Sequence, residues 1–384
     1  MVRRITVITR YFWPEGGGAE HATYLIIRDV LSRVGDVTVI SGTRRPAIVR
    51  GVNYVFWAPL SGSKPRVLLE SILRFGDIRS VIEDSDIVYI PSNAVLPLTI
   101  LVRRTNPSAR VILHLHDFQA VNYEAAVING RSASLVEQVR IERFNGDLTR
   151  ALSIGYLNWL GPLYAAALGY ADDIICVSHA QARVIEDRLR GIRCRVIYNP
   201  IPEIPEIEKA PTDEPLFVSL GGDRYVKGFH VLLGAIRQLA LSNRKLVIVV
   251  TRTRDRREFV LGNLRLVMAG RLSYNDVIRV VGSSWSTLFL SVLDEPLPYA
   301  VIESLLLKTI PIAIGRGGVP EILKGSGAEE FMVNDEYDIV NVINKVAAMS
   351  REELVEIGNK LREYAVKKFD NDEIRQELLR VFLD

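Results

Sequence analysis

Cysteine is scarce in this chain of 384 residues, which contains only Cys176 and Cys194. Two cysteines provide neither a disulfide framework nor the ligand spacing of a metal cluster, so disulfide-stapled folds and cysteine-based metal modules are excluded. Each cysteine lies in or next to a predicted strand. We therefore expect both to be core residues of a protein from a reducing compartment.

The amino terminus lacks the features of an export signal. Arg3 and Arg4 precede a short predicted strand, which is followed by further charge and proline rather than by a long apolar stretch. This pattern predicts that the chain carries no signal peptide and is cytoplasmic.

Net charge is small, +3 at pH 7, but it is unevenly divided. Residues 1–200 contain 24 Lys and Arg against 18 Asp and Glu, whereas residues 201–384 contain 24 against 27. A basic amino-terminal half suits an anionic lipid surface, such as the inner face of a membrane, or a phosphate-bearing acceptor. Ordinary surface solvation is the alternative.

Charge is missing altogether from the 21 residues 151–171. A run of this length could span a bilayer. However, three glycines, Pro162 and Asn158 interrupt it, and a span between two strands of one sheet would disrupt that sheet. We expect a helical hairpin packed on the first domain, or an apolar surface that rests on a membrane through Trp159 and Tyr164.

What the chain does have is a regular alternation of predicted strands and helices. Apolar strand segments recur from Ile5–Thr9 to Ile310–Ile314 with helices between them, which is typical of buried parallel sheets. Residues 201–215 are rich in proline and acid, as an interdomain linker would be. At this length two domains are expected, namely 1–200 and 201–370, followed by a terminal helix at 371–384.

Two glutamates, Glu295 and Glu303, form the most informative motif. Glu295 follows a predicted strand at 287–292, and Glu303 lies about one turn into a predicted helix at 299–307. A carboxylate accepts two hydrogen bonds from a vicinal diol, and the amides that open the helix, at Tyr299 and Ala300, are donors for phosphate. The motif favours a sugar nucleotide site; the alternative is a helix whose acids only complement its dipole.

Two neighbouring segments point to the same kind of ligand. Gly317 and Gly318 precede a predicted helix, where glycine lets backbone amides approach an anion closely. Lys227 ends a loop, residues 221–228, between a predicted strand and a predicted helix. A lysine at this position is well placed for a diphosphate.

Together these segments resemble the retaining glycosyltransferases of the GT-B fold, family 4, also called glycosyl transferases group 1. The resemblance covers nearly the whole chain. It implies an α/β protein in which two Rossmann-like β/α/β domains face each other across a cleft, the first for the acceptor and the second for the donor, with the last helix crossing back to the first domain. It rests on the order and spacing of Gly16-Gly17-Gly18-Ala19-Glu20, His114-Leu115-His116-Asp117, Lys227-Gly228, Glu295, Glu303 and Gly317-Gly318-Val319-Pro320-Glu321.

Carried over residue by residue, the resemblance implies a donor site that needs no metal and no cofactor besides the nucleoside diphosphate sugar. Glu303 would bind the ribose and Glu295 the transferred sugar, while Lys227 would neutralise the diphosphate. His116 would lie beside the reacting carbon, unless it is only a satisfied histidine at a strand end. The implied catalytic residues are His116, Glu295 and Lys227, and the implied donor-binding residues are Gly17, Gly18, Arg224, Lys227, Tyr299, Ala300, Glu303, Gly317 and Gly318.

The chain departs from the family pattern at three places. Gly222 stands where an arginine usually supplies a second cation to the diphosphate, and Arg224 is the candidate replacement. Leu297-Pro298 stands where Phe-Gly is usual, which removes an N–H donor beside the sugar. Lys308 occupies a position where glycine is common, and we interpret it as a local packing difference.

One basic run has no place in this scheme. Arg252, Arg254, Arg256 and Arg257 follow one another on a predicted loop. No recognised nucleic-acid module accompanies them, so we predict a solvated loop and no nucleic-acid partner.

The sequence thus predicts a metal-independent retaining glycosyltransferase of the hexosyl type. It would move a sugar from a nucleoside diphosphate to a hydroxyl acceptor such as a lipid-linked glycan or a polysaccharide precursor, with peripheral membrane contact through the first domain. Two alternatives stay open: a sugar-nucleotide epimerase of the same fold, and a non-catalytic sugar-nucleotide binding subunit, for which Gly222 and Pro298 give grounds. No motif identifies the base, the sugar or the acceptor.

Overall fold

The computed structural model describes residues 2–334 and 338–384, and the chain divides into two compact units. Unit 1 comprises Met1–Leu135, Leu152–Pro202 and Phe369–Asp384, and unit 2 comprises Val136–Ala151 and Glu203–Lys368. The carboxyl-terminal helix therefore groups with unit 1. Residues 136–151, which the sequence boundaries assign to the first domain, group with unit 2.

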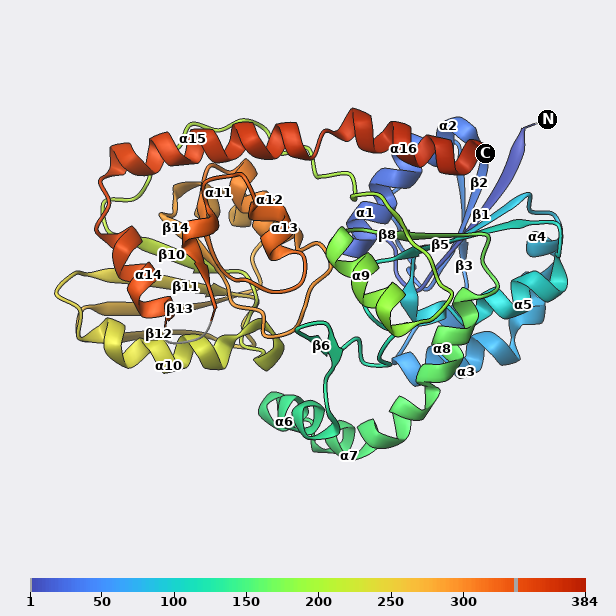
Figure 1. The fold of residues 1–384 in the computed structure, drawn as a ribbon, viewed down its shortest axis with the longest axis horizontal. Helices are drawn as coiled ribbons and strands as arrows, with labels where there is room; N and C mark the ends of the chain where they lie inside the picture. Colours follow the sequence, from blue (N-terminus) through green and yellow to red (C-terminus); the bar gives the residue numbers. More distant parts are fainter. Residues whose placement is uncertain (1, 335–337) are drawn as a thin grey trace. The chain divides into compact units, whose positions relative to one another are not determined.

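Unit 1 is built on a parallel sheet whose central strands are nearly continuous apolar runs, as buried parallel strands require. Its strand order is β3-β2-β1-β4-β5-β8-β9, and the strands are visible in Figure 1. A two-stranded hairpin, β6 (Val127–Ile128) with β7 (Arg131–Ser132), is separate from it. The sheet strands are β1 (Arg3–Thr9), β2 (Gly35–Ser41), β3 (Val52–Phe56), β4 (Ile87–Ile90), β5 (Arg110–Leu115), β8 (Asp173–Cys176) and β9 (Arg195–Val196).

Helices cover both faces of the unit 1 sheet (Figure 1). One face carries α1 (Gly18–Ile26), a π-helical turn (Ile27–Leu31) and α2 (Ser32–Val34), against which the last helix packs. The other carries α3 (Lys64–Leu73), α4 (Arg79–Glu83), α5 (Leu98–Thr105) and α8 (Gly161–Leu168). The remaining helices of the first half are α6 (Leu135–Asn145), α7 (Leu148–Leu157) and α9 (His179–Arg188).

The last helix, α16 (Asn371–Leu383), is fixed to unit 1 by an ion pair and by apolar packing. Arg375 Nη2 lies 2.9 Å from Asp29 Oδ2, and both side chains are largely buried. The Phe382 ring meets the ring of Tyr89 edge to face at a centroid distance of 5.3 Å. These contacts make α16 part of the unit 1 core.

The uncharged stretch 151–171 is helical, as predicted, and is formed by α7, a 3₁₀ turn (Asn158–Leu160) and α8. No helix within the described residues is long and apolar enough to cross a membrane. Tyr164 was expected at a membrane surface, and this expectation is wrong. Its ring is buried against Tyr123, and its hydroxyl donates a hydrogen bond to the carbonyl of Ala94 at 3.2 Å.

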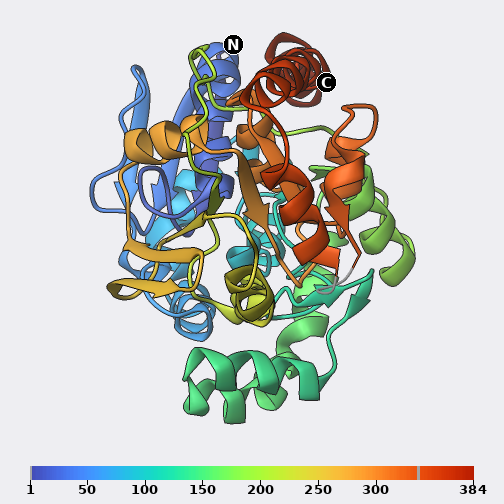
Figure 2. The ribbon, with the colours of Figure 1, turned by 90° about the vertical axis from the view of Figure 1, so that its left-hand side faces the viewer.

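Unit 2 contains a second sheet, with strand order β12-β13-β11-β10-β14-β15-β16. All neighbouring strands are parallel except β12, which runs antiparallel to β13 and forms the sheet edge (Figure 2). Arg256 and Arg257 were predicted to lie on a loop, but they open this edge strand. The strands are β10 (Leu216–Ser219), β11 (Leu246–Thr251), β12 (Arg256–Leu261), β13 (Leu264–Gly270), β14 (Ser286–Phe289), β15 (Ile310–Ile314) and β16 (Met332–Val333).

Helices also cover both faces of the unit 2 sheet (Figure 1). One face carries α10 (Phe229–Ala240) and α14 (Asp338–Ala347). The other carries α11 (Tyr274–Ser283), α12 (Tyr299–Leu306) and α15 (Arg351–Lys368), and α13 (Val319–Leu323) follows β15. Further 3₁₀ turns lie at Ala58–Leu60, Phe75–Ile78, Asn93–Val95, Tyr225–Lys227 and Glu329–Phe331.

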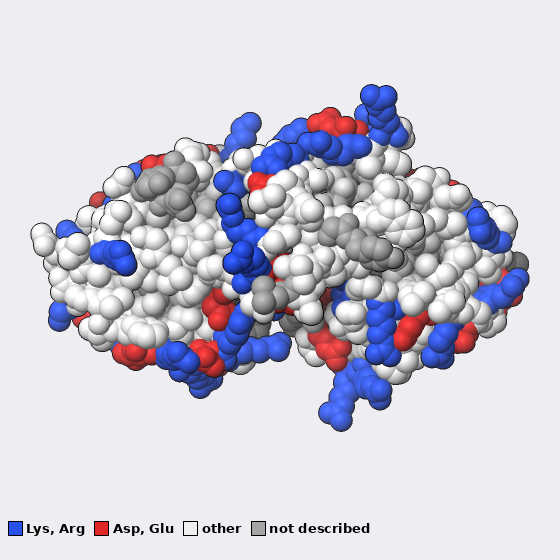
Figure 3. All heavy atoms as spheres, turned by 90° about the horizontal axis from the view of Figure 1, so that it is seen from below, with Lys and Arg blue, Asp and Glu red and all other residues white. Residues whose placement is uncertain are grey.

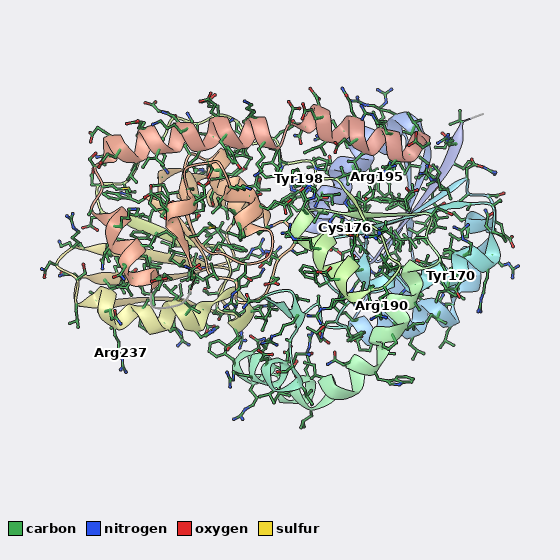
Figure 4. All side chains as sticks on the ribbon, in the orientation of Figure 1. Tyr170, Cys176, Arg190, Arg195, Tyr198 and Arg237 are labelled. Atoms are coloured by element: carbon green, nitrogen blue, oxygen red, sulfur yellow. A yellow bond between two sulfur atoms is a disulfide. The ribbon has the colours of Figure 1, made fainter. Side chains whose placement is uncertain are left out.

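The two cysteines are bonded to each other, which corrects the prediction of two separate core thiols. Cys176 ends β8, and Cys194 directly precedes β9, the parallel neighbour of β8. This neighbouring position brings the two Cα atoms to 5.6 Å, within the usual range for a disulfide. Cys176 is labelled in Figure 4. The pairing follows from strand adjacency and could not be read from a sequence separation of 18 residues.

Candidate functional site

Most of the predicted donor residues lie in unit 2, in loops at one edge of its sheet or in the helix α12 that follows one of these loops. Strands β11, β10, β14 and β15 are consecutive parallel neighbours. The loops that follow them, at 252–255, 220–228, 290–298 and 315–318, therefore leave the sheet from the same edge. In open α/β sheets this carboxyl edge is where ligands bind.

Hydrogen bonds join the loop after β10 to the loop after β14. The Val292 N–H donates to the Val226 carbonyl at 3.0 Å, and the Ser291 hydroxyl donates to the same carbonyl at 3.1 Å. Gly228 has φ +77°, and a Cβ at this residue would lie 1.9 Å from the carbonyl oxygen of Leu290. Only glycine allows this approach, which places the end of the first loop directly beside the second.

Because these two loops lie close together, two of the predicted catalytic residues are in contact. Lys227 Nζ donates to Glu295 Oε1 at 2.6 Å. Their side chains are 37% and 25% exposed, so the pair is partly shielded but still reachable by a ligand. The structure thus places a cation and a hydrogen-bond acceptor side by side at the sheet edge.

Glu303 lies in α12 and is half-buried. Burial raises the pKa of its carboxyl group to about 7, against the opposing effects of a hydrogen bond from Tyr274 and of the positive charge of Arg252. The Tyr274 hydroxyl donates to Glu303 Oε1 at 3.3 Å. Near neutral pH, Glu303 therefore exchanges between an acceptor-only carboxylate and a neutral acid.

The loop that carries Glu295 leads directly into α12. Pro298 is the N-cap residue, so Tyr299 and Ala300 occupy the first helical positions, and their predicted contact with phosphate stays a prediction. Pro298 itself has no N–H to offer. The first amides of α12 therefore follow directly on the loop that carries Glu295.

Gly317 and Gly318 allow a close backbone packing against that same loop. A Cβ on Gly317 would lie 2.5 Å from the Glu295 carbonyl oxygen, and one on Gly318 would lie 2.0 Å from the Pro296 carbonyl oxygen. The Gly318 N–H donates to the Glu295 carbonyl at 2.8 Å. In this structure the two glycines hold the Glu295 loop in place, while their predicted contact with an anion stays a prediction.

Two of the departures from the family pattern have local explanations. Lys308 adopts φ +56°, the left-handed conformation that glycine favours after a helix end, and its ammonium group pairs with Glu206 at 2.9 Å. Gly222 has φ +74°, and a Cβ there would lie 2.9 Å from the Arg252 carbonyl oxygen. A side chain at 222 would therefore be strained and crowded. Arg224 is exposed, and its carbonyl accepts the N–H groups of Lys227 and Phe229.

The glycine loop of unit 1 opens α1. Gly16 has φ +94°, and Gly17 is the N-cap residue of the helix, which begins at Gly18. Glu20 Oε2 accepts a hydrogen bond from the Gly17 N–H at 2.7 Å. A carboxylate thus contacts a backbone amide that the resemblance assigns to phosphate.

His116 lies just beyond β5 in unit 1. Its ring stacks on the ring of His114 at 4.4 Å, and its Nδ1 lies 3.3 Å from the side-chain nitrogen of Asn199. Burial lowers the pKa of His116 to about 3, so the imidazole is neutral at physiological pH. Within the part of the chain that the structure describes, its Nε2 is buried without a hydrogen-bond partner.

Several features of unit 2 were not found from the sequence. Tyr274 opens α11 and contacts Glu303, but a tyrosine at a helix start carries no recognisable signal. Residues at the end of α6 contact the loop after β10, since Asn145 Oδ1 accepts the Tyr225 N–H at 3.4 Å. The Phe144 ring lies edge to face with the stacked rings of Tyr225 and His230. Only the tertiary fold could reveal these contacts.

No cluster of three or more His, Cys, Asp or Glu side chains suited to a metal ion occurs among the residues that the structure describes. The polar groups at the sheet edge are instead cationic and amide donors together with the acceptor carboxylates of Glu295 and Glu303.

Comparison with known proteins gives the family. Residues 200–368 match the family described as glycosyl transferases group 1, and residues 16–203 match glycosyltransferase family 4. The two matches adjoin and cover most of the chain. The chain belongs to the family 4 glycosyltransferases. This confirms the family predicted from the sequence and the prediction of a glycosyltransferase.

Solved structures confirm the GT-B fold of this glycosyltransferase. Anabaena HepE, solved with UDP-glucose, is 14% identical with a TM-score of 0.67, covering 99% of each chain. The sucrose-phosphate synthase of Thermosynechococcus elongatus is also 14% identical with a TM-score of 0.70, covering 99% of this chain and 98% of its own. WaaG, a glycosyltransferase of lipopolysaccharide biosynthesis, is 13% identical with a TM-score of 0.66, covering 98% and 99%. No curated protein matches the sequence significantly.

Proposed function

We propose that this glycosyltransferase takes a sugar from a nucleoside diphosphate donor, with retention of configuration, and transfers it to a hydroxyl acceptor. The observation that carries the proposal is the Lys227–Glu295 pair at the carboxyl edge of the unit 2 sheet, with Glu303 on the helix that follows. HepE, a structure of the same fold, was solved with a nucleoside diphosphate sugar, which supports the same donor class here.

In the proposed reaction, Glu303 accepts hydrogen bonds from the ribose and Glu295 from the sugar hydroxyls. The bond between the anomeric carbon and the β-phosphate oxygen breaks, and its electron pair leaves with the diphosphate. Lys227 and the first amides of α12 stabilise the developing negative charge, since they place positive potential at the leaving group. The acceptor hydroxyl attacks from the same face, and its proton passes to the departing phosphate oxygen. These residues supply the positive charge, so the proposal includes no metal.

Release of nucleoside diphosphate from UDP-glucose, GDP-mannose and ADP-glucose, with and without polyprenyl phosphate sugars as acceptors, tests the proposal. Removing one electrostatic donor from the leaving group costs about 100-fold to 1,000-fold in turnover, so Lys227→Ala should lose at least that much. Lys360 forms a comparable 2.6 Å pair with Glu356 on exposed surface. Lys360→Ala is therefore the matched control and should retain wild-type turnover.

Three outcomes would contradict the proposal. A new sugar nucleotide formed without any acceptor would identify an epimerase. Donor binding without turnover on any acceptor would identify a non-catalytic subunit. Wild-type turnover in Lys227→Ala would show that the pair is not part of the site.

We also propose that the acceptor is carried by an anionic membrane, which unit 1 contacts through an exposed apolar surface at Leu152 and Trp159. Their exposed fractions are 87% and 76%, unusually high for side chains of this size. Residues 1–200 are net basic, and Lys and Arg side chains project from the face shown in Figure 3 with Asp and Glu between them. Basic side chains attract anionic lipid, and tryptophan favours the headgroup region.

Sedimentation with vesicles tests this contact. The protein should bind phosphatidylglycerol vesicles more than phosphatidylcholine vesicles, and Leu152→Ser with Trp159→Ser should weaken binding severalfold. Leu241→Ser is the control, because Leu241 is 84% exposed but lies in unit 2. Equal losses in both variants would contradict a specific surface on unit 1.

A further inference from the structure

The basic run after β11 contains one arginine whose position the proposed reaction leaves unused. Arg252 follows the last residue of β11 and is exposed. Within the described residues, its guanidinium group has no hydrogen bond and no ion pair. Arg254, two residues on, donates to the carbonyl of Asn145 at 2.8 Å, and Arg257 pairs with Asp255. In this respect Arg252 differs from Arg254 and Arg257.

The backbone at Arg252 is held in an uncommon conformation. Its φ is +58°, in the left-handed region that non-glycine residues seldom adopt. The register between β11 and β13 shifts at Val250/Thr251, and the Arg252 N–H donates to the Gly270 carbonyl at 2.5 Å. Irregularities of this kind re-aim side chains next to functional sites.

The side chain of Arg252 starts beside the loop that carries Lys227. An ideal Cβ built on Gly222 would lie 3.5 Å from the Cβ of Arg252. The two loops are also joined by a hydrogen bond from the Arg254 N–H to Asp223 Oδ2 at 3.3 Å. The Arg252 side chain therefore begins directly beside the position that a side chain at residue 222 would have.

The positive charge of Arg252 interacts with Glu303, the second glutamate of the site. It is near enough to the Glu303 carboxylate to oppose the rise of that pKa. Lys227, by contrast, is paired with Glu295. A cation thus accompanies each of the two glutamates, one on the ribose side and one on the sugar side of the proposed donor.

From this placement we infer that Arg252 binds the diphosphate of the donor, at the phosphate next to the ribose, while Lys227 serves the phosphate next to the sugar. The inference rests on the proposed function, because it assumes that Glu303 binds ribose and Glu295 binds the sugar. A diphosphate joins those two groups, so it must pass between the two cations. Guanidinium suits this role, since its planar fork donates two parallel hydrogen bonds to phosphate oxygens. Arg224, the replacement predicted from the sequence, is then not required.

The test compares a diphosphate with its own nucleoside. UDP, GDP and ADP are titrated against the wild type by calorimetry, and the tightest binder is paired with uridine, guanosine or adenosine in ligand-observed NMR titrations. Arg252→Gly removes the side chain and suits the positive φ, so the backbone is not penalised. Thermal melting checks that the variant stays folded.

A hydrogen bond to a charged group contributes about 1.5 to 3 kcal/mol, which is about 10-fold to 150-fold in affinity. Arg252→Gly should weaken diphosphate binding by this factor and change nucleoside binding less than twofold. Arg252→Lys should recover part of the loss. Arg254→Ala changes the net charge equally and, as the matched control, should leave affinity for the diphosphate within twofold of wild type.

Three results would overturn the inference while leaving the proposed function intact. Diphosphate binding unchanged in Arg252→Gly would remove Arg252 from the site. An equal loss for nucleoside and diphosphate would mean that Arg252 acts only through Glu303. A loss in Arg224→Ala in place of Arg252→Gly would restore the prediction from the sequence. If no nucleotide binds the wild type, the proposed function itself fails and the inference fails with it.

Discussion

The raised pKa of Glu303 makes the stability of unit 2 depend on pH in a predictable direction. Burial lifts the carboxyl pKa from 4.5 to about 7, so the folded state holds a proton that the unfolded state has already released. Folded protein therefore binds more protons between about pH 4.5 and pH 7, and the free energy of unfolding falls as pH rises through this window. A difference of about 2.5 pKa units corresponds to about 3 kcal/mol.

Glu303→Gln removes the titration while keeping the size of the side chain. Its free energy of unfolding, relative to that of the wild type, should increase by about 3 kcal/mol between pH 4 and pH 8. Urea unfolding followed by circular dichroism at steps of half a pH unit measures this difference. Because every other titrating group is shared by the two proteins, their contributions cancel in the comparison.

A second variant tests the cause. Tyr274→Phe removes the hydrogen bond that favours the ionised carboxylate, so the decline in stability should extend to higher pH than in the wild type. Parallel pH curves for wild type and Glu303→Gln, within about 0.5 kcal/mol, would refute the reasoning, because they would mean that burial does not perturb Glu303.

Two further predictions concern the framework of unit 2. Gly228→Ala should destabilise the protein by more than the roughly 1 to 3 kcal/mol of a strained φ, since a Cβ would also lie 1.9 Å from the Leu290 carbonyl oxygen. Gly234→Ala, in open space on α10, should stabilise the protein by up to about 1 kcal/mol. Thermal melting distinguishes them, and equal melting temperatures would contradict the packing argument. Lys209 is buried, and burial lowers its pKa to about 7. The folded state therefore binds fewer protons than the unfolded state between about pH 7 and pH 10, and stability should rise with pH there by an amount on the order of 5 kcal/mol. Lys209→Met should abolish this rise in urea unfolding experiments, and an unchanged slope would contradict the burial argument.

Much of the fold was predictable because its strands are parallel and buried. A strand covered on both faces is a nearly continuous apolar run, so β1, β4, β5 and β15 stand out in the sequence. Edge strand β12 is exposed along its whole length and begins with Arg256 and Arg257. This strand is not a continuous apolar run, and the arginines at its start were predicted to lie on a loop.

The site was predictable in its residues but not in its contacts. Lys227 and Glu295 were assigned separately, to the diphosphate and to the sugar. Their pairing depends on β10 and β14 being neighbours and on the Gly228 contact between their loops. Tyr274 has no sequence signal, because its role depends on where α11 begins relative to α12. Such relations between elements appear only once the sheet order is known.

The departures from local preference in unit 2 gather around the candidate site. Arg252, directly after β11, is one of four described residues other than glycine that have positive φ. Glu303 is an acid whose burial raises its pKa, and Gly228 is fixed by a contact that no side chain would allow. Each feature costs stability by itself, and sequences usually keep such costs where function requires them. These structural features are observed independently of the family match, and they support the proposed donor site at the carboxyl edge of the second sheet.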